Sequence, residues 1–255
     1  MAIDIYVGSL GCYYTGDWMT FASQWAAGLL QDDVRLRRLG VVEAAGSEGE
    51  GGTQKIVEIK SNRRFIRPAS DAGQKVEEWK AGLNANFGDR LGKPIEWSEE
   101  YPKYFTDKVG WNSYNALLLW AAYDEHPELM RPLHVPGSLA DDPAYERSTD
   151  PSFDSRYVHL LDGVIWLPGL EHFNFGLEDP AGTKVRVGFT TSLLIELERL
   201  NSRTWRADDE EISAWEEEEP EAQAPLEECA KFGFGILHSL TTTAVRHGLP
   251  MLLDF

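Results

Sequence analysis

The sequence lacks the standard signatures of an enzyme or a metalloprotein. It contains no G-x-x-x-x-G-K-[ST] phosphate loop, no G-x-G-x-x-G between a strand and a helix, and no H-E-x-x-H, C-x-x-C or G-x-S-x-G. The six histidines share no metal-ligand spacing. We therefore predict no metal and no cofactor, and we favour a function other than catalysis.

Cysteine is scarce, and long apolar runs are missing. The two cysteines, Cys12 and Cys229, are too few for a disulfide framework or a four-thiolate metal site. No apolar run approaches the ~18 residues that span a bilayer, and residues 1–10 carry no positively charged leader. We expect a cytoplasmic protein that does not bind membranes.

Positive charge is scarce as well. The chain has 42 Asp and Glu residues against 24 Lys and Arg residues, for a net charge of −18. Such a surface repels phosphate backbones and anionic lipids, so we expect no nucleic-acid ligand and no membrane partner. It attracts a basic protein, although acidic charge also serves solubility alone.

What the sequence does contain is enough apolar material for a core. Of its 255 residues, 42% are hydrophobic, including nine Trp, nine Tyr and eleven Phe residues. We predict a single α+β domain over 1–255, with a mixed or antiparallel sheet packed by several amphipathic helices. Loops expected to be flexible cover 44–53, 130–156 and 205–224.

The C-terminal segment carries the strongest pattern. From Pro225 onward, apolar residues recur at steps of three and four, which predicts a long amphipathic helix. Gly248 suits the left-handed residue that ends a helix. Residues 251–253 then predict a short buried strand, and we expect this helix to brace the whole domain.

Weaker patterns predict the remaining elements. Residues 11–17 are expected to form a turn, and Trp111 to point inward from a helix. The predicted strands cover 2–7, 39–43, 55–60, 94–97, 157–167, 173–177 and 184–189. The predicted helices cover 17–30, 70–86, 109–123 and 190–202.

An acidic run with aromatic residues is the first candidate site. No Lys or Arg lies between Arg206 and Lys231, so the run does not neutralise itself. The simpler interpretation is a solvated loop. The alternative is a protein-binding patch, in which charge steers the encounter and aromatic side chains hold the contact. Its residues are Trp205, Asp208, Asp209, Glu210, Glu211, Trp215, Glu216, Glu217, Glu218 and Glu219.

A turn after the first strand is the second candidate site. Such turns hold ligands in open α/β sheets. A ligand pocket there would use Tyr6, Cys12, Tyr13, Tyr14, Asp17 and Trp18. The simpler interpretation is an aromatic core cluster with a small cysteine beside it. Catalysis by Cys12 would need a histidine partner, which the sequence does not identify.

Three smaller sets of residues are also candidates. His159 with Asp162, or Glu171 with His172, has the residue types for general acid–base work. The basic stretch from Lys55 to Arg67 has the residue types for anion binding. In each case proximity in the sequence is the sole observation.

These patterns favour an acidic protein-interaction domain. It would bind a basic protein and neutralise it, as an immunity-type inhibitor neutralises a toxin. The comparison is generic and rests on charge and on the absence of catalytic motifs. The alternative is an enzyme or a small-ligand-binding protein that uses an aromatic-lined pocket near residues 12–18.

Overall fold

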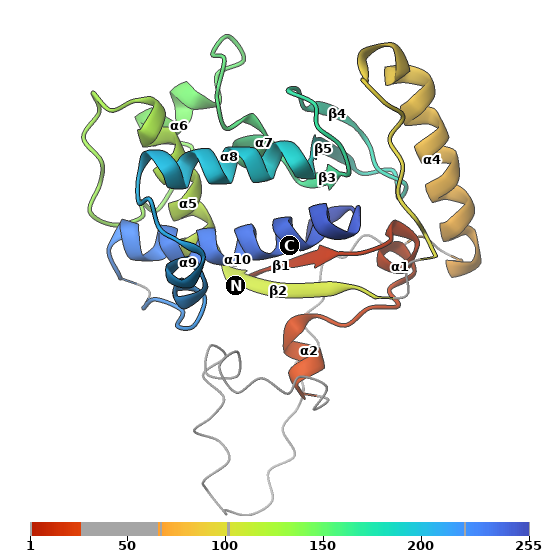
Figure 1. The fold of residues 1–255 in the computed structure, drawn as a ribbon, viewed down its shortest axis with the longest axis horizontal. Helices are drawn as coiled ribbons and strands as arrows, with labels where there is room; N and C mark the ends of the chain where they lie inside the picture. Colours follow the sequence, from red (N-terminus) through yellow and green to blue (C-terminus); the bar gives the residue numbers. More distant parts are fainter. Residues whose placement is uncertain (1, 27–65, 67, 101–102, 222, 255) are drawn as a thin grey trace, which may run out of the picture.

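The computed structural model describes residues 2–26, 66, 68–100, 103–221 and 223–254. These residues form a six-stranded mixed sheet with the order β2-β1-β6-β3-β5-β4, flanked by helices (Figure 1). The β3 and β5 strands are parallel, and the other neighbours are antiparallel. The predicted α+β class is confirmed. The strands are β1 (Ala2–Val7), β2 (Phe105–Gly110), β3 (Ile165–Leu167), β4 (Phe175–Glu178), β5 (Lys184–Phe189) and β6 (Met251–Asp254).

Alternation along the strands divides the core into two layers. Ile3, Ile5 and Val7 of β1 enter one apolar cluster, whereas Tyr6 enters the other. The same alternation separates Met251 and Leu253 of β6 from Leu252. Because successive side chains of a strand point to opposite faces, both faces of the sheet are buried.

Helices cover both faces of this sheet. The first cluster lies under α5 (Trp111–Glu125), α7 (Val158–Asp162), α8 (Thr190–Arg203), α9 (Asp209–Trp215) and α10 (Leu226–His247). The second lies under α1 (Leu10–Thr15) and α4 (Ala72–Phe87). The short α2 (Phe21–Ala26) contacts β2, and α6 (Pro143–Ser148) contacts α5. Three-residue 3₁₀ turns precede and follow α4, at Ala69–Asp71 and Gly88–Arg90.

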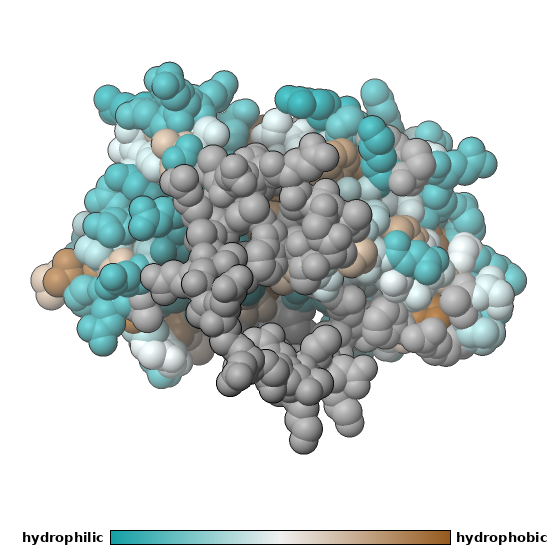
Figure 2. Space-filling model, turned by 90° about the horizontal axis from the view of Figure 1, so that it is seen from below, coloured by the Kyte–Doolittle hydropathy of each residue, from teal (hydrophilic) through white to brown (hydrophobic). Residues whose placement is uncertain are grey.

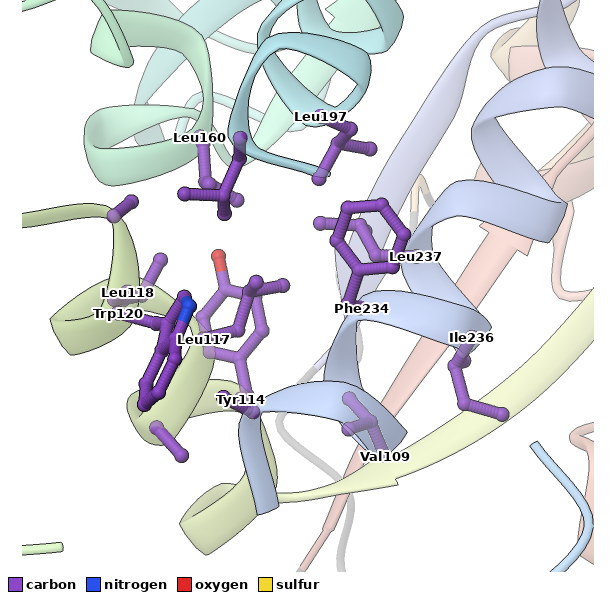
Figure 3. Packing of buried hydrophobic residues seen from close by; sticks show 14 of the residues in the cluster. Val109, Tyr114, Leu117, Leu118, Trp120, Leu160, Leu197, Phe234, Ile236 and Leu237 are labelled. Carbon is purple, nitrogen blue, oxygen red and sulfur yellow. The ribbon is translucent and has the colours of Figure 1, made fainter. Parts of the chain in front are cut away.

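The C-terminal helix α10 is the brace that the sequence predicts. It packs against α5, α8, α9 and β2, and its buried face contributes Phe234 and Leu237 to a centre shared with Leu117 and Leu197 (Figure 3). Gly248 ends the helix with φ 61°, in the left-handed region. The chain then continues into β6.

Two glycines inside α10 allow neighbouring helices to approach closely. A Cβ on Gly233 would lie 2.5 Å from the carbonyl oxygen of Ser113 in α5. A Cβ on Gly235 would lie 2.8 Å from Cγ of Glu216 and 3.2 Å from the carbonyl oxygen of Ile212. Glycine disfavours a helix interior, so its presence at both positions follows from these contacts. The α9 helix is thereby held tightly against α10.

Several sequence predictions agree with the structure. Strands at 2–7, 173–177 and 184–189 correspond to β1, β4 and β5, and helices at 70–86, 109–123 and 190–202 correspond to α4, α5 and α8. The predicted strands at 39–43 and 55–60, the loop at 44–53 and the basic stretch from Lys55 lie outside the described residues. Of the predicted helix 17–30, residues 21–26 form α2, and residues 27–30 lie outside the described residues.

Other predictions are wrong near the N-terminus and around residue 95. Residues 11–17 are not simply a turn, because α1 forms there with Ser9 accepting a hydrogen bond from the Cys12 amide. Residues 17–20 are not helical, and α2 begins at Phe21. Residues 94–97 form no strand, because the side chain of Asn84 bonds both the amide and the carbonyl of Ile95 in place of a neighbouring strand.

Further corrections concern the middle of the chain. The segment 157–167 is not one strand, because Glu196 accepts hydrogen bonds from the amides of His159 and Leu160 and thereby caps the helix α7. The β2 strand was not predicted, and Trp111 is 37% exposed rather than inward. The predicted loops 130–156 and 205–224 contain α6 and α9, each with an aspartate at its N-cap.

Within the described ranges, no helix combines the length and the apolar composition needed to cross a membrane.

Candidate functional site

The acidic run is built around a capped helix. Asp208 and Glu211 form a capping box: the Glu211 amide donates to Asp208 Oδ1 at 2.9 Å, and the Asp208 amide donates to Glu211 Oε2 at 3.0 Å. Asp209 and Glu210 complete an acidic first turn, which the helix dipole favours. The first half of the run therefore has a structural explanation, which is the start of α9.

The second half of the run has a different character. Glu217, Glu218 and Glu219 follow α9, and their side chains are exposed. Among the residues that the structure describes, none of these three carboxylates has an ion-pair partner. Glu216 differs, because it is half-buried and packs over Gly235. Negative charge thus accumulates directly beyond the C-terminal end of α9.

This segment folds over the start of α10 and encloses a cleft. The cleft has a volume of about 400 Å³, and we call it the acidic cleft. Its lining residues come from α9, the connection after it and the first turns of α10: Ala214, Trp215, Glu218, Glu219, Pro220, Glu221, Glu228, Lys231 and Phe232. Four carboxylates and two aromatic rings therefore surround one opening.

Lys231 is the basic residue in this lining, and it is already paired. Its Nζ lies 2.9 Å from Glu227 Oε1, one helical turn away, and 5.5 Å from the centroid of the Trp215 ring. Lys231 shows that a cation fits above this ring. The remaining carboxylates of the cleft have no such partner among the described residues.

The two predicted tryptophans take different places. Trp215 lines the cleft, with its ring 6.0 Å from that of Phe234. Trp205 packs inward: its ring stacks on Trp120 at 5.3 Å with an interplanar angle of 12° and meets Trp215 edge-on. Trp205 therefore supports Trp215 from behind and does not line the cleft.

Sequence reasoning missed part of this site. Glu221 belongs to the predicted acidic run but not to the residues predicted to bind a partner, and Glu228, Lys231 and Phe232 belong to neither set. All four residues line the cleft. The available signal is the pair of acidic residues in the first turn of the C-terminal helix, Glu227 and Glu228, which also interact favourably with the helix dipole.

The aromatic turn near residue 12 is packed into the core. Tyr6, Tyr13, Tyr14 and Trp18 are buried, and their rings contact one another at centroid distances of 5.0–5.6 Å. Each tyrosine hydroxyl donates a hydrogen bond, to the Ser9 carbonyl, Asp254 and Asp179 respectively. The structure thus brings these side chains together, in contact with each other. This packing favours the core interpretation over a ligand pocket.

Cys12 and Asp17 lie at the border of this cluster. Cys12 is half-buried, with Sγ 3.4 Å from the Asp17 carbonyl oxygen, and Asp17 is exposed. Burial raises the pKa of the Cys12 thiol. A raised pKa leaves little thiolate at neutral pH, which is the opposite of what a nucleophilic cysteine needs.

The histidine candidates do not form the predicted pairs. His159 Nδ1 lies 2.7 Å from Glu196 Oε1 in a buried contact, and Asp162 binds Arg186 and Asn174 instead. Glu171 accepts a hydrogen bond from the Gly92 amide, and His172 is exposed. Glu196 was missed because it lies 37 residues from His159 in the chain. Its position caps α7, so we interpret the pair as structural.

Comparison of the chain with protein-family models, with curated proteins and with solved structures finds no match.

Proposed function

We propose that this protein is an interaction module that binds a basic protein through the acidic cleft. The observation that carries the proposal is the set of exposed carboxylates without ion-pair partners among the described residues, gathered around the ring of Trp215. Carboxylates are suited to bind Lys or Arg side chains, and an aromatic face adds a cation–π contact.

The proposed binding mode combines steering with one desolvated contact. The net charge of −18 attracts a basic partner over long range and increases the rate of encounter. A Lys or Arg side chain of the partner then enters the cleft and contacts the Trp215 ring beside Glu218 and Glu219. Charges on the rim fix the orientation, and the half-buried Trp215 ring supplies affinity.

The biological role that fits this chemistry best is neutralisation of a basic protein, as by an immunity-type inhibitor of a toxin. An inhibitor needs a tight complementary surface and no reaction of its own. The proposal includes a cytoplasmic location and no nucleic-acid ligand, in keeping with the charge. The alternative of an enzyme or small-ligand site near residues 12–18 gains no support from the packed aromatic cluster.

Affinity capture from the lysate of the native host tests this proposal. The immobilised protein is exposed to lysate at about 50 mM and about 500 mM salt, which differ several-fold in Debye length. We expect retention of a basic protein at low salt and reduced retention at high salt. Identification of that protein would give the function. Retention of an acidic protein, with no dependence on salt, would contradict the proposal.

A further inference from the structure

Two large apolar side chains project into solvent beside the acidic cleft. Met130 is 93% exposed and Leu133 is 71% exposed, the highest values among the large hydrophobic residues that the structure describes. They lie in the connection between α5 and α6, and we call them the apolar ridge. Single exposed apolar residues are common, but two within four residues on a fixed segment indicate an interaction surface.

Contacts before and within the ridge hold the segment that carries it. Just before Met130, the Leu129 amide donates to the His126 carbonyl oxygen at 3.0 Å. The Leu133 carbonyl accepts a hydrogen bond from the Leu226 amide at 2.8 Å, and His134 Nδ1 lies 3.3 Å from the Ala224 carbonyl oxygen. The guanidinium of Arg131 stacks over the Trp120 ring at 3.7 Å. On this held segment, the side chains of Met130 and Leu133 point away from the core.

The same contacts place the ridge next to the acidic cleft. Leu226 is the first residue of α10, whose first turn carries Glu227 and Glu228, and Glu228 lines the cleft. In Figure 1 the connection between α5 and α6 lies at the same end of the molecule as α9 and the start of α10. Figure 2 shows hydrophobic atoms among hydrophilic ones at that end.

We infer that the apolar ridge and the acidic cleft form one docking surface for a basic amphipathic segment, which carries Lys or Arg on one side and large apolar residues on the other. This inference rests on the proposed function and specifies the partner's chemistry. A purely cationic segment would leave Met130 and Leu133 in water, and a purely apolar one would leave the carboxylates around Trp215 unpaired. In protein interfaces, apolar contacts commonly supply the affinity, and charged residues fix the orientation of the partner.

Two synthetic helical peptides provide the probe. The first carries lysines on one face and leucines on the other, and the second has the same lysines with every leucine replaced by glutamine. Fluorescence anisotropy measures Kd for both at several salt concentrations. We expect the wild-type protein to bind the amphipathic peptide at least about tenfold more tightly, because only this peptide covers the ridge.

Three variants separate the contributions. Met130→Ser/Leu133→Ser should remove the preference for the amphipathic peptide and leave the salt dependence unchanged. Glu218→Gln/Glu219→Gln/Glu221→Gln should weaken binding of both peptides and flatten the salt dependence. Leu170→Ser, at a residue 52% exposed in the connection between β3 and β4, is the matched control and should bind as wild type does.

The outcomes distinguish the inference from the proposed function. An unchanged preference in Met130→Ser/Leu133→Ser, together with weaker binding in the glutamate variant, would overturn the ridge and leave the acidic cleft standing. An unchanged Kd in the glutamate variant would overturn the proposed function and, with it, the composite surface. Circular dichroism and the single variant Met130→Ser keep the test valid if the double variant is poorly folded.

Discussion

The two glycines inside α10 give a prediction whose magnitude follows from the structure. In the described residues, Gly82 of α4 is a glycine in a comparable helix interior, and a Cβ there would meet nothing within 4 Å. Replacement of glycine by alanine in a helix interior stabilises the helix by about 0.5–1 kcal/mol. We therefore expect Gly82→Ala to raise the free energy of unfolding by that amount.

Gly233→Ala gains the same helix propensity but introduces a clash. Its Cβ would lie 2.5 Å from the backbone oxygen of Ser113, and α5 and α10 must separate to accept it. Overpacking of a core costs about 1–3 kcal/mol. Because the propensity gain is common to both variants, the difference between Gly233→Ala and Gly82→Ala isolates this cost.

Gly235→Ala extends the prediction to the candidate site. Its Cβ would lie 2.8 Å from Cγ of Glu216, so this variant should displace the end of α9 and the cleft that follows it. The flexible Glu216 side chain can move, although the Ile212 carbonyl at 3.2 Å cannot move without the helix. We expect a smaller loss of stability than for Gly233→Ala, together with weaker partner binding.

Urea unfolding followed by tryptophan fluorescence measures these differences. Stability should follow the order Gly82→Ala, wild type, Gly235→Ala, Gly233→Ala, with about 1–3 kcal/mol between the first and the last. If Gly233→Ala were as stable as Gly82→Ala, the close approach of α5 to α10 at this position would be refuted.

Three further predictions address buried polar groups. Glu196→Ala removes the acceptor of the His159 and Leu160 amides and the partner of His159 Nδ1. The free energy of unfolding, measured in the same assay, should fall by about 3 kcal/mol or more. A loss below about 1 kcal/mol would argue against a structural role. Burial raises the pKa of Tyr6, Tyr114 and Tyr157, and it raises the pKa of Tyr123 to about 12. The folded state favours the neutral form of these tyrosines, so their contribution to stability is complete below pH 10. Above pH 10 it should fall by about 1.4 kcal/mol per pH unit for each tyrosine. Absorbance at 295 nm during alkaline titration should show these tyrosines ionising together on unfolding, and separate early ionisation would contradict their burial. Cys12 should react with iodoacetamide more slowly at pH 7 than a free cysteine does, because its raised pKa leaves less thiolate, and fast alkylation at pH 7 would revive the nucleophile hypothesis.

Predictions from local patterns succeeded where the local pattern also decides the structure. The long apolar stripe and Gly248 were sufficient for α10, and alternation was sufficient for β1 and β5. They failed where a distant residue decides. Asn84 keeps Ile95 out of a strand, and Glu196 turns residues 158–162 into a helix. Neither contact can be inferred from the sequence of the segment whose structure it determines.

The candidate site shows the same limit. The acidic run was evident from composition, but its division into a capping half and an exposed half depends on the helix α9. The direction of Trp205, inward against Trp120, depends on a contact across 85 residues of chain. Burial of this kind is set by tertiary packing, which periodicity within one segment does not report.

The most direct test of the acidic cleft compares two charge reversals of equal size. The test variant replaces Glu217, Glu218, Glu219 and Glu221 by lysine, and it spares Glu216 because that residue packs on Gly235. The control replaces four exposed acids on or near α4: Glu77, Glu78, Glu96 and Glu100. Each reversal changes the net charge by four times +2, from −18 to −10.

Stopped-flow association with the captured basic partner at low salt is the measurement. We expect the reversal at the cleft to lower the association rate constant by at least about tenfold and to raise Kd further, whereas the control should have a much smaller effect. Equal effects of the two reversals would mean that total charge alone attracts the partner. That result would contradict the acidic cleft as the binding site.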